Sequence, residues 1–201
     1  MKNLLRRYIR QTLTERTDDY EWAYLLSTPF SARNALAAYY CDYYDADSIL
    51  EVGGYRNPIH QFYKGPASKI TIVDPMLTES RQIHNTAGNT CEVIQKRGRL
   101  HETEIEPHDT VVCMGLAIYD TLFEHNRSHE RFKELCKSAE TVILGVPTEW
   151  EDSVKAANDI MESLPHKKTV DIAMDFTPSG VEDVVPVHNK RRLIVLRDKK
   201  R

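Results

Sequence analysis

The chain has 201 residues, of which 41% are hydrophobic and 28% are charged, and its formal net charge is −3. This length suits one domain with a buried core, and we expect a single domain over residues 1–201. The slightly acidic balance argues against nonspecific nucleic-acid binding, which shows as a basic excess. No stretch approaches the roughly 20 apolar residues of a membrane-spanning helix, so we expect no membrane partner.

The first 47 residues are predicted to be helical. A first amphipathic helix is indicated by apolar residues at helical spacing, namely Leu4, Leu5, Tyr8, Ile9 and Leu13. A second short helix begins at Asp18 and is broken by Pro29. Ser31 is a good N-cap for a third helix that runs to about Tyr44.

From residue 48 onward, strands and helices alternate. Strands are predicted at 48–53, 69–74, 91–95, 110–114, 141–146, 169–176 and 192–197. Helices are predicted at 56–64, 77–86, 128–138 and 149–164. Apolar strands separated by helices indicate a parallel sheet that is buried on both faces. The last two strands have no helix between them, so they must pair antiparallel.

The most informative stretch runs from Ser48 to Leu77, where two apolar strands each end in an acid. Glu51 is followed by Gly53 and Gly54, and Asp74 lies 23 residues after Glu51. A βαβ unit that binds a nucleoside needs this layout. The glycines let the backbone pass close to the ligand, and the second acid accepts hydrogen bonds from the ribose hydroxyls. The stretch therefore predicts a nucleoside-containing cofactor.

The order of these elements resembles that of the class I S-adenosylmethionine (SAM) dependent methyltransferases. The resemblance covers roughly residues 48–198 and is carried by Ile49–Gly54, Val73–Pro75 and Asp109–Gly115. It implies an α/β fold of the Rossmann-like kind, a three-layer αβα sandwich around a mostly parallel seven-stranded sheet. A C-terminal antiparallel strand and a helical N-terminal cap over residues 1–47 complete this expectation. The implied cofactor is S-adenosyl-L-methionine.

The chain departs from the family pattern at two places. The family shows an acid followed by three alternate glycines, whereas here Tyr55 and Asn57 stand at the second and third glycine positions. The third parallel strand lacks the usual acid that meets the adenine amino group, and residues 97–102 stand there instead. Backbone amides or Glu102 are the candidates to replace that acid.

The resemblance implies a set of cofactor-binding residues. Glu51 is expected near the methionine amino group, with capping of the following turn as the alternative. Asp74 is expected at an exposed strand edge, where it accepts the ribose hydroxyls. The further cofactor-binding residues are Gly53, Gly54, Tyr55, Pro75, Met76, Gly98, Met114 and Gly115.

Candidate catalytic residues follow the fourth strand, where the family places the transferring group. They are Tyr119, Asp120 and His125, and a histidine suits proton transfer because its unperturbed pKa is about 6.5. The alternative is that Asp120 and His125 cap the next helix or lie in solvent. The Asn/Asp-Pro-Pro-aromatic motif of many amine and nucleic-acid methyltransferases is absent. His125 and His129 lack a third ligand at suitable spacing, so no metal is expected.

Aromatic residues are concentrated before the first strand. Tyr20, Trp22 and Tyr24 are the candidate substrate-binding residues, because aromatic faces attract cations such as a sulfonium. The alternative is that these rings pack the cap onto the sheet. Four cysteines without a CxxC pair fit a reducing cytoplasm, where we expect the protein to be located.

The function predicted from these features is methyl transfer from SAM to a small-molecule metabolite, in a biosynthetic role. Two alternatives stay open. One is a SAM-consuming enzyme, a cyclase, lyase or alkyl transferase, that breaks the aminocarboxypropyl bond and releases methylthioadenosine. The other is a non-catalytic partner subunit with the same fold. The expected partner is a small molecule, without nucleic acid or membrane, and a homodimer is left open.

Overall fold

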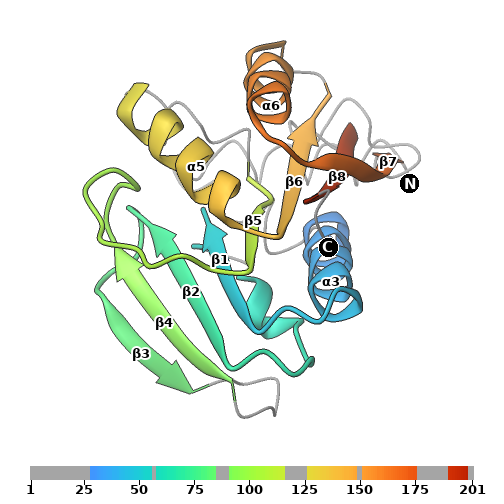
Figure 1. Ribbon diagram of the computed structural model, residues 1–201. Helices are drawn as coiled ribbons and strands as arrows, with labels where there is room; N and C mark the ends of the chain where they lie inside the picture. Colours follow the sequence, from blue (N-terminus) through green and yellow to red (C-terminus); the bar gives the residue numbers. More distant parts are fainter. Residues whose placement is uncertain are drawn as a thin grey trace, which may run out of the picture.

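The computed structural model describes residues 28–55, 58–84, 91–115, 126–148, 151–175 and 190–198. Its centre is one eight-stranded sheet in the order β3-β4-β2-β1-β5-β6-β8-β7 (Figure 1). The strands are β1 (Ser48–Val52), β2 (Lys69–Asp74), β3 (Arg81–His84), β4 (Glu92–Arg97), β5 (Thr110–Cys113), β6 (Thr141–Pro147), β7 (Lys167–Asp175) and β8 (Lys190–Arg197). The helices are α3 (Thr28–Tyr43), η1 (Ile59–Gln61), α5 (Asn126–Ser138) and α6 (Glu151–Ser163).

The pairing of the strands confirms the expected sheet and adds one strand to it. Strands β4, β2, β1, β5 and β6 are parallel to one another. At the C-terminal end, β8 pairs antiparallel with both β6 and β7, as the absence of a helix between the last two strands predicted. The additional strand is β3, which pairs antiparallel with β4 at the other edge.

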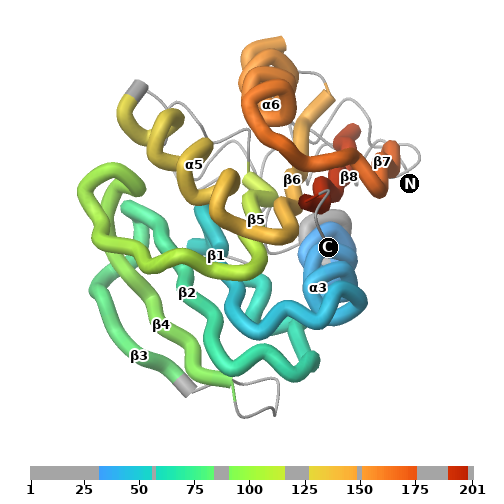
Figure 2. The backbone as a smooth tube through the Cα atoms, in the orientation of Figure 1, coloured from blue at the N-terminus to red at the C-terminus, as the bar shows by residue number. Residues whose placement is uncertain are grey.

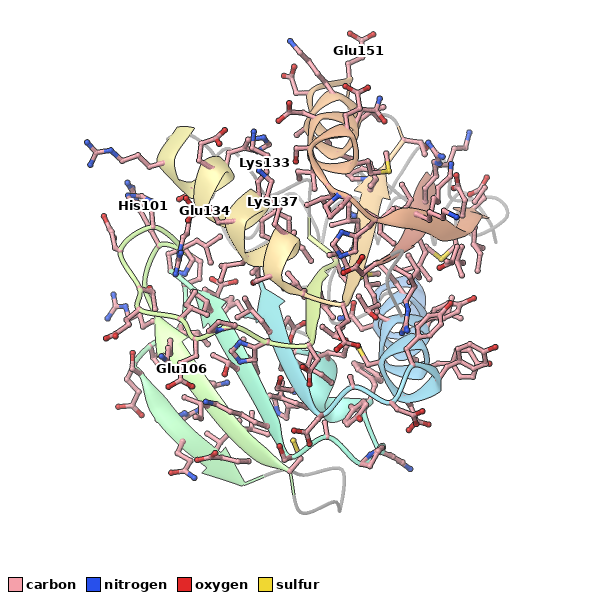
Figure 3. All side chains as sticks on the ribbon, viewed as in Figure 1. His101, Glu106, Lys133, Glu134, Lys137 and Glu151 are labelled. Atoms are coloured by element: carbon pink, nitrogen blue, oxygen red, sulfur yellow. The ribbon has the colours of Figure 1, made fainter. Side chains whose placement is uncertain are left out.

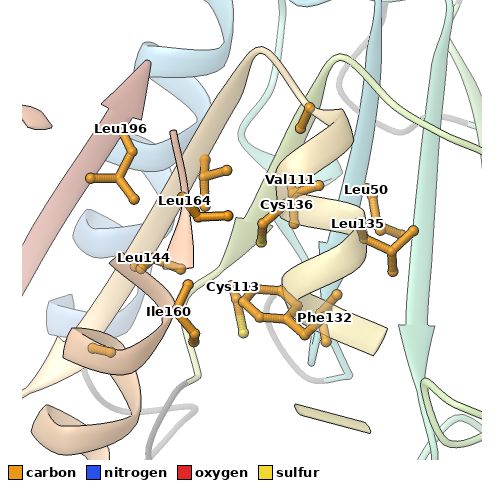
Figure 4. Packing of buried hydrophobic residues seen from close by; sticks show 14 of the residues in the cluster. Leu50, Val111, Cys113, Phe132, Leu135, Cys136, Leu144, Ile160, Leu164 and Leu196 are labelled. Carbon is orange, nitrogen blue, oxygen red and sulfur yellow. The ribbon is translucent and has the colours of Figure 1, made fainter. Parts of the chain in front are cut away.

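Apolar side chains cover both faces of the sheet, because its central strands are buried on each side. On one face, α5 and α6 pack through Phe132, Leu135 and Ile160 against β1, β5 and β6 (Figure 4). On the other face, α3 and η1 pack through residues such as Cys41 and Ile59. The result is the expected three-layer arrangement, and the tube in Figure 2 follows the chain through it.

Helix α3 begins three residues before the predicted N-cap Ser31, and the predicted start was therefore wrong. Pro29 lies in the first turn of α3, where the N–H that proline lacks would have no partner within the helix. At its other end, α3 leads into β1 through a tight turn. The amide of Ala46 donates to the Cys41 carbonyl, and Asp45 adopts a positive φ of 51°.

Two of the predicted helices were wrong. In the described part of the predicted helix 56–64, residues 58–64, the chain forms the 3₁₀ turn η1, which follows Pro58 and ends before Gly65 and Pro66. Both residue types disfavour a longer helix.

In place of a helix at 77–86 there is strand β3. Its polar side chains bond across to β4. The Arg81 Nε donates to Gln95 Oε1 at 3.0 Å, and the Gln82 Nε2 donates to Glu92 Oε1 at 2.9 Å. Cross-strand pairing therefore outweighs the helical pattern of the sequence.

Among the described residues, no helix has the length and apolar character needed to cross a bilayer. All four cysteines are buried and carry free thiols.

Phe132 is fully buried between α5 and the sheet, so truncating it tests the packing of this layer. We expect Phe132→Ala to lower the free energy of unfolding by about 3–5 kcal/mol, because it removes apolar contacts and leaves a cavity. Urea denaturation measures this change. Glu134→Ala, on the solvent side of the same helix, is the matched control and should cost less than about 1 kcal/mol. Equal losses in the two variants would contradict this packing.

Candidate functional site at the carboxyl edge of the sheet

The carboxyl ends of the parallel strands bring most of the expected cofactor-binding residues to one edge. The turn after β1 carries Gly53–Tyr55, and the ends of β2 and β5 carry 75–76 and 114–115. Strand β1 lies between β2 and β5. The chain continues from β2 toward the edge that carries β4 and β3, and from β5 toward the edge that carries β6, so the two connections diverge on either side of β1. In an open α/β sheet this switch point is where ligands bind.

Both glycines of the turn after β1 are required by its geometry. Gly53 has a φ of 84°, a conformation that side chains disfavour, and its amide donates to the Val73 carbonyl at 2.9 Å. Gly54 has no room for a side chain. An added Cβ would lie 2.6 Å from the Glu51 Oε2 and 2.9 Å from the Ile72 Cγ2. The turn therefore lies directly on the Glu51 carboxyl group.

Glu51 is enclosed beneath this turn, on the face of the sheet that α3 and η1 cover. Its side chain is 2% exposed, and its Oε2 accepts a hydrogen bond from the Ile59 amide at 2.8 Å. Burial raises the pKa of Glu51 to about 8, the Asp74 charge adds to this rise, and the Ile59 bond and Arg33 oppose it. Glu51 thus makes the turn-capping contact that the sequence left open as the alternative to a cofactor contact.

Asp74 closes the same turn from the end of β2. Its Oδ1 accepts from the Met76 amide at 2.8 Å, and its Oδ2 accepts from the Tyr55 amide at 3.2 Å. Burial raises the pKa of Asp74, and these two amide bonds oppose the rise. The expectation of an exposed position was wrong. Asp74 is only 7% exposed, because the backbones of both turns fold over its carboxylate.

The remaining expected cofactor-binding residues surround these two acids. Met76 is 60% exposed beside Pro75. The Gly98 amide donates to the Asp74 carbonyl at 3.4 Å, which places the end of β4 next to the end of β2. Met114 is 3% exposed, and its side chain packs in the core on the α3 side.

The candidates for catalysis and substrate binding lie outside the described residues. They are Tyr119, Asp120, His125, Tyr20, Trp22 and Tyr24. His129, the second histidine of the predicted pair, lies on α5. Its Nε2 lies 2.5 Å from the Asp159 Oδ2 of α6 and so joins the two helices.

Sequence reasoning missed two groups at this edge. Arg33 and Asn34 of α3 are 4% and 2% exposed. They lie at helical spacing before the buried Ala37, Ala38 and Cys41, which is the signal that could have found them. In the loop after β4, the His101 Nδ1 lies 2.5 Å from the Ser128 Oγ at the start of α5. Figure 3 shows His101 beside this end of α5.

The arrangement suits an adenosine-containing ligand. Each carboxylate oxygen of Asp74 carries two lone pairs, so after accepting one amide each they can accept ribose hydroxyls as well. The exposed Met76 side chain supplies apolar surface for a base. The turn at Gly53 and Gly54 presents backbone without side chains. The residues present therefore fit S-adenosyl-L-methionine.

Comparison with known proteins gives structural neighbours only. No protein-family model matches the sequence, and no curated protein matches it. Among solved structures, the chain is similar to the N-methyltransferase NodS from Bradyrhizobium japonicum WM9 in complex with S-adenosyl-L-homocysteine. The TM-score is 0.59 at 10% identity, over 96% of this chain and 99% of that one.

Two further neighbours show the same likeness. Magnesium protoporphyrin IX methyltransferase (ChlM) from Synechocystis PCC 6803, with bound SAM, gives a TM-score of 0.57 at 10% identity, over 98% of this chain and 96% of that one. An O-methyltransferase from Bacillus cereus, in complex with S-adenosyl-L-homocysteine, gives 0.55 at 9% identity, over 98% and 100%. The chain therefore has the fold of the class I SAM-dependent methyltransferases.

Replacing Glu51 tests whether its carboxyl is protonated in the folded protein. With a folded-state pKa of about 8, the folded protein holds a proton that the unfolded chain loses near pH 4.5. Wild-type stability should therefore fall as pH rises, by on the order of 2–3 kcal/mol between pH 6 and 8 relative to Glu51→Gln. The glutamine keeps an oxygen for the Ile59 amide and does not titrate. Chemical denaturation at pH 6, 7, 8 and 9 measures the difference.

Glu106→Gln is the control for this series. Lys69 holds the pKa of Glu106 below its usual value, so this carboxylate is ionised in folded and unfolded chains throughout the range. The free energy of unfolding of Glu106→Gln should change with pH in parallel with that of the wild type. If Glu51→Gln also runs parallel, Glu51 is not protonated at neutral pH.

Proposed function

We propose that the chain binds SAM at the carboxyl edge of β1 and β2 and transfers its methyl group to a small molecule. The observation that carries this proposal is the position of Asp74. Its carboxylate lies at the end of the strand next to β1 and bonds to the turn that follows β1. In a sheet of this order, that is where an acid receives the two hydroxyls of a ribose.

The residues around Asp74 have separate tasks in this proposal. Gly53 and Gly54 let the backbone approach the cofactor, and Tyr55 lies beside it. Pro75 and Met76 pack against the adenine, and the amides near Gly98 lie at its edge. Glu51, beneath the turn, favours the cationic amino end. Because its pKa is about 8, an approaching ammonium group would draw it toward the ionised form.

SAM supplies a methyl group that its sulfonium already makes electrophilic. The protein then has to hold the acceptor in line with that methyl and exclude water. We assign the acceptor side to Tyr119, Asp120 and His125, with Tyr20, Trp22 and Tyr24 as the wall of the substrate pocket. A small-molecule acceptor is supported by the net charge of −3 and by a neighbour named for a porphyrin substrate.

Asp74→Asn tests the ribose contact while keeping one oxygen for the neighbouring amides. We expect it to weaken SAM binding by about tenfold or more, because a hydrogen bond to a charged group contributes about 1.5–3 kcal/mol. Isothermal titration calorimetry measures the affinity. The matched control is Asp109→Asn, whose carboxylate accepts the Ser48 amide at the opposite edge of the sheet. Unchanged affinity in Asp74→Asn would remove Asp74 from the site.

Product analysis separates methyl transfer from the two alternatives. Incubated with SAM alone, the protein should return intact SAM, and S-adenosylhomocysteine should form only when an acceptor is added. Liquid chromatography with mass spectrometry measures both compounds. Formation of methylthioadenosine without an acceptor would instead indicate cleavage of the aminocarboxypropyl bond. Absence of SAM binding would indicate a non-catalytic subunit.

A further inference from the structure

Strand β7 forms one end of the sheet and pairs with β8 on its inner side (Figure 1). In the described part of the chain, no other strand pairs with its outer side. Six of its nine residues are exposed, whereas β3, at the other end of the sheet, is only four residues long. A long, exposed edge strand is a template for pairing with another chain.

On the α3 side, β7 presents an apolar row that continues into exposed aromatic rings. Val170 and Ile172 are only partly buried against the core. The end of α3 lies beside this row, because the Tyr44 Oη is 3.3 Å from the Thr169 Oγ1. Tyr43 contacts Tyr44 with 4.9 Å between ring centres and is 61% exposed. Exposed tyrosines next to an open strand are typical of a protein interface.

The opposite face of β7 carries its charges. Asp171, Ala173 and Asp175 alternate with the apolar row and are exposed. Lys168 lies on this face as well, because its Nζ is 2.6 Å from the Asp171 Oδ2. A basic residue therefore lies near the start of the strand and an acid at its end. Such a strand is complementary in charge to an antiparallel copy of itself.

We propose that a second copy of this chain pairs antiparallel with β7, with Ile172 of each copy on the two-fold axis. In this register, Val170 lies opposite Met174 of the second copy, and Ala173 lies opposite Asp171 of the second copy. The register shift between Lys168 and Val170 brings Lys168 to Asp175 of the second copy.

Other registers are less favourable. A shift by one residue places the apolar row against the charged row. A two-fold axis at Asp171 opposes the two copies of that acid, and an axis at Ala173 opposes Asp171 and Asp175. The inference goes beyond the proposed function and does not depend on it, because β5, β6 and β8 separate β7 from β1.

Cysteine cross-linking tests the register. Oxidised glutathione should link Ile172→Cys into a disulfide-bonded dimer of twice 23.2 kDa, since the four native cysteines are buried. Residues paired across antiparallel strands have Cα atoms about 4.5–5.5 Å apart, within the span of a disulfide. Non-reducing gel electrophoresis measures the product. Ile83→Cys is the matched control and should stay monomeric. Ile83 is also partly buried on the α3 side, but it lies on β3 at the other end of the sheet.

Two variants of the exposed Ala173 test the pairing without an oxidant. Ala173→Glu places an acid opposite Asp171 of the second copy, twice in each dimer, and should raise the dimer dissociation constant by about two- to thirtyfold. Ala173→Lys places a base there and should lower the dissociation constant by a similar factor. Analytical ultracentrifugation measures both constants, and circular dichroism checks that both variants fold.

Three results would overturn the inference and leave the proposed function standing. They are a wild-type protein that is monomeric throughout a concentration series, equal cross-linking of the two cysteine variants, and equal effects of the two Ala173 variants. If Ile172→Cys fails to fold, the Ala173 pair decides. A protein that forms this dimer but does not bind SAM overturns the proposed function alone.

Discussion

Two buried carboxyl groups hold the turn that follows the first strand, and the candidate site depends on them. Glu51 accepts the Ile59 amide beneath the turn, and Asp74 accepts the Tyr55 and Met76 amides beside it. Burying two acids within one small region is costly, and it raises the pKa of each. Because the backbone turns satisfy these carboxyl groups, the turn and the ends of β1 and β2 form one connected unit.

In the described residues, the connections after β1 and β2 do not contain the helices that were predicted there. After β1 and β2, the chain uses a 3₁₀ turn and an edge strand in place of the two predicted helices. Complete helices cover the sheet at α3, α5 and α6, which pack against the central strands. The chain therefore has the class I methyltransferase fold, with β3 added at one edge of the sheet.

Much of the fold could be predicted from the sequence, because buried parallel strands are apolar without interruption. The local pattern of apolar residues alone predicts strands such as 69–74 and 141–146. It also predicts helix 128–138, with Phe132 facing inward. Strand β3 could not be predicted in this way. Its residues have a helix-compatible pattern, and their conformation depends on antiparallel pairing with β4, to which the side-chain bonds of Arg81 and Gln82 add.

The positions of the main site residues could also be predicted from the sequence, but their burial could not. The positions of Gly53, Gly54 and Asp74 at one edge follow from the strand–turn–strand pattern, but the burial of Asp74 depends on how two turns fold over it. The burial of Arg33 was missed because it depends on how α3 packs against the sheet, which no local pattern encodes.

A crystal structure of the protein with S-adenosylhomocysteine tests the assignment of Asp74 to the ribose most directly. We expect the ribose hydroxyls within hydrogen-bond distance of the Asp74 carboxylate and the amino-acid portion over Gly53 and Gly54. A ligand bound elsewhere, or a ribose without contact to Asp74, would contradict it.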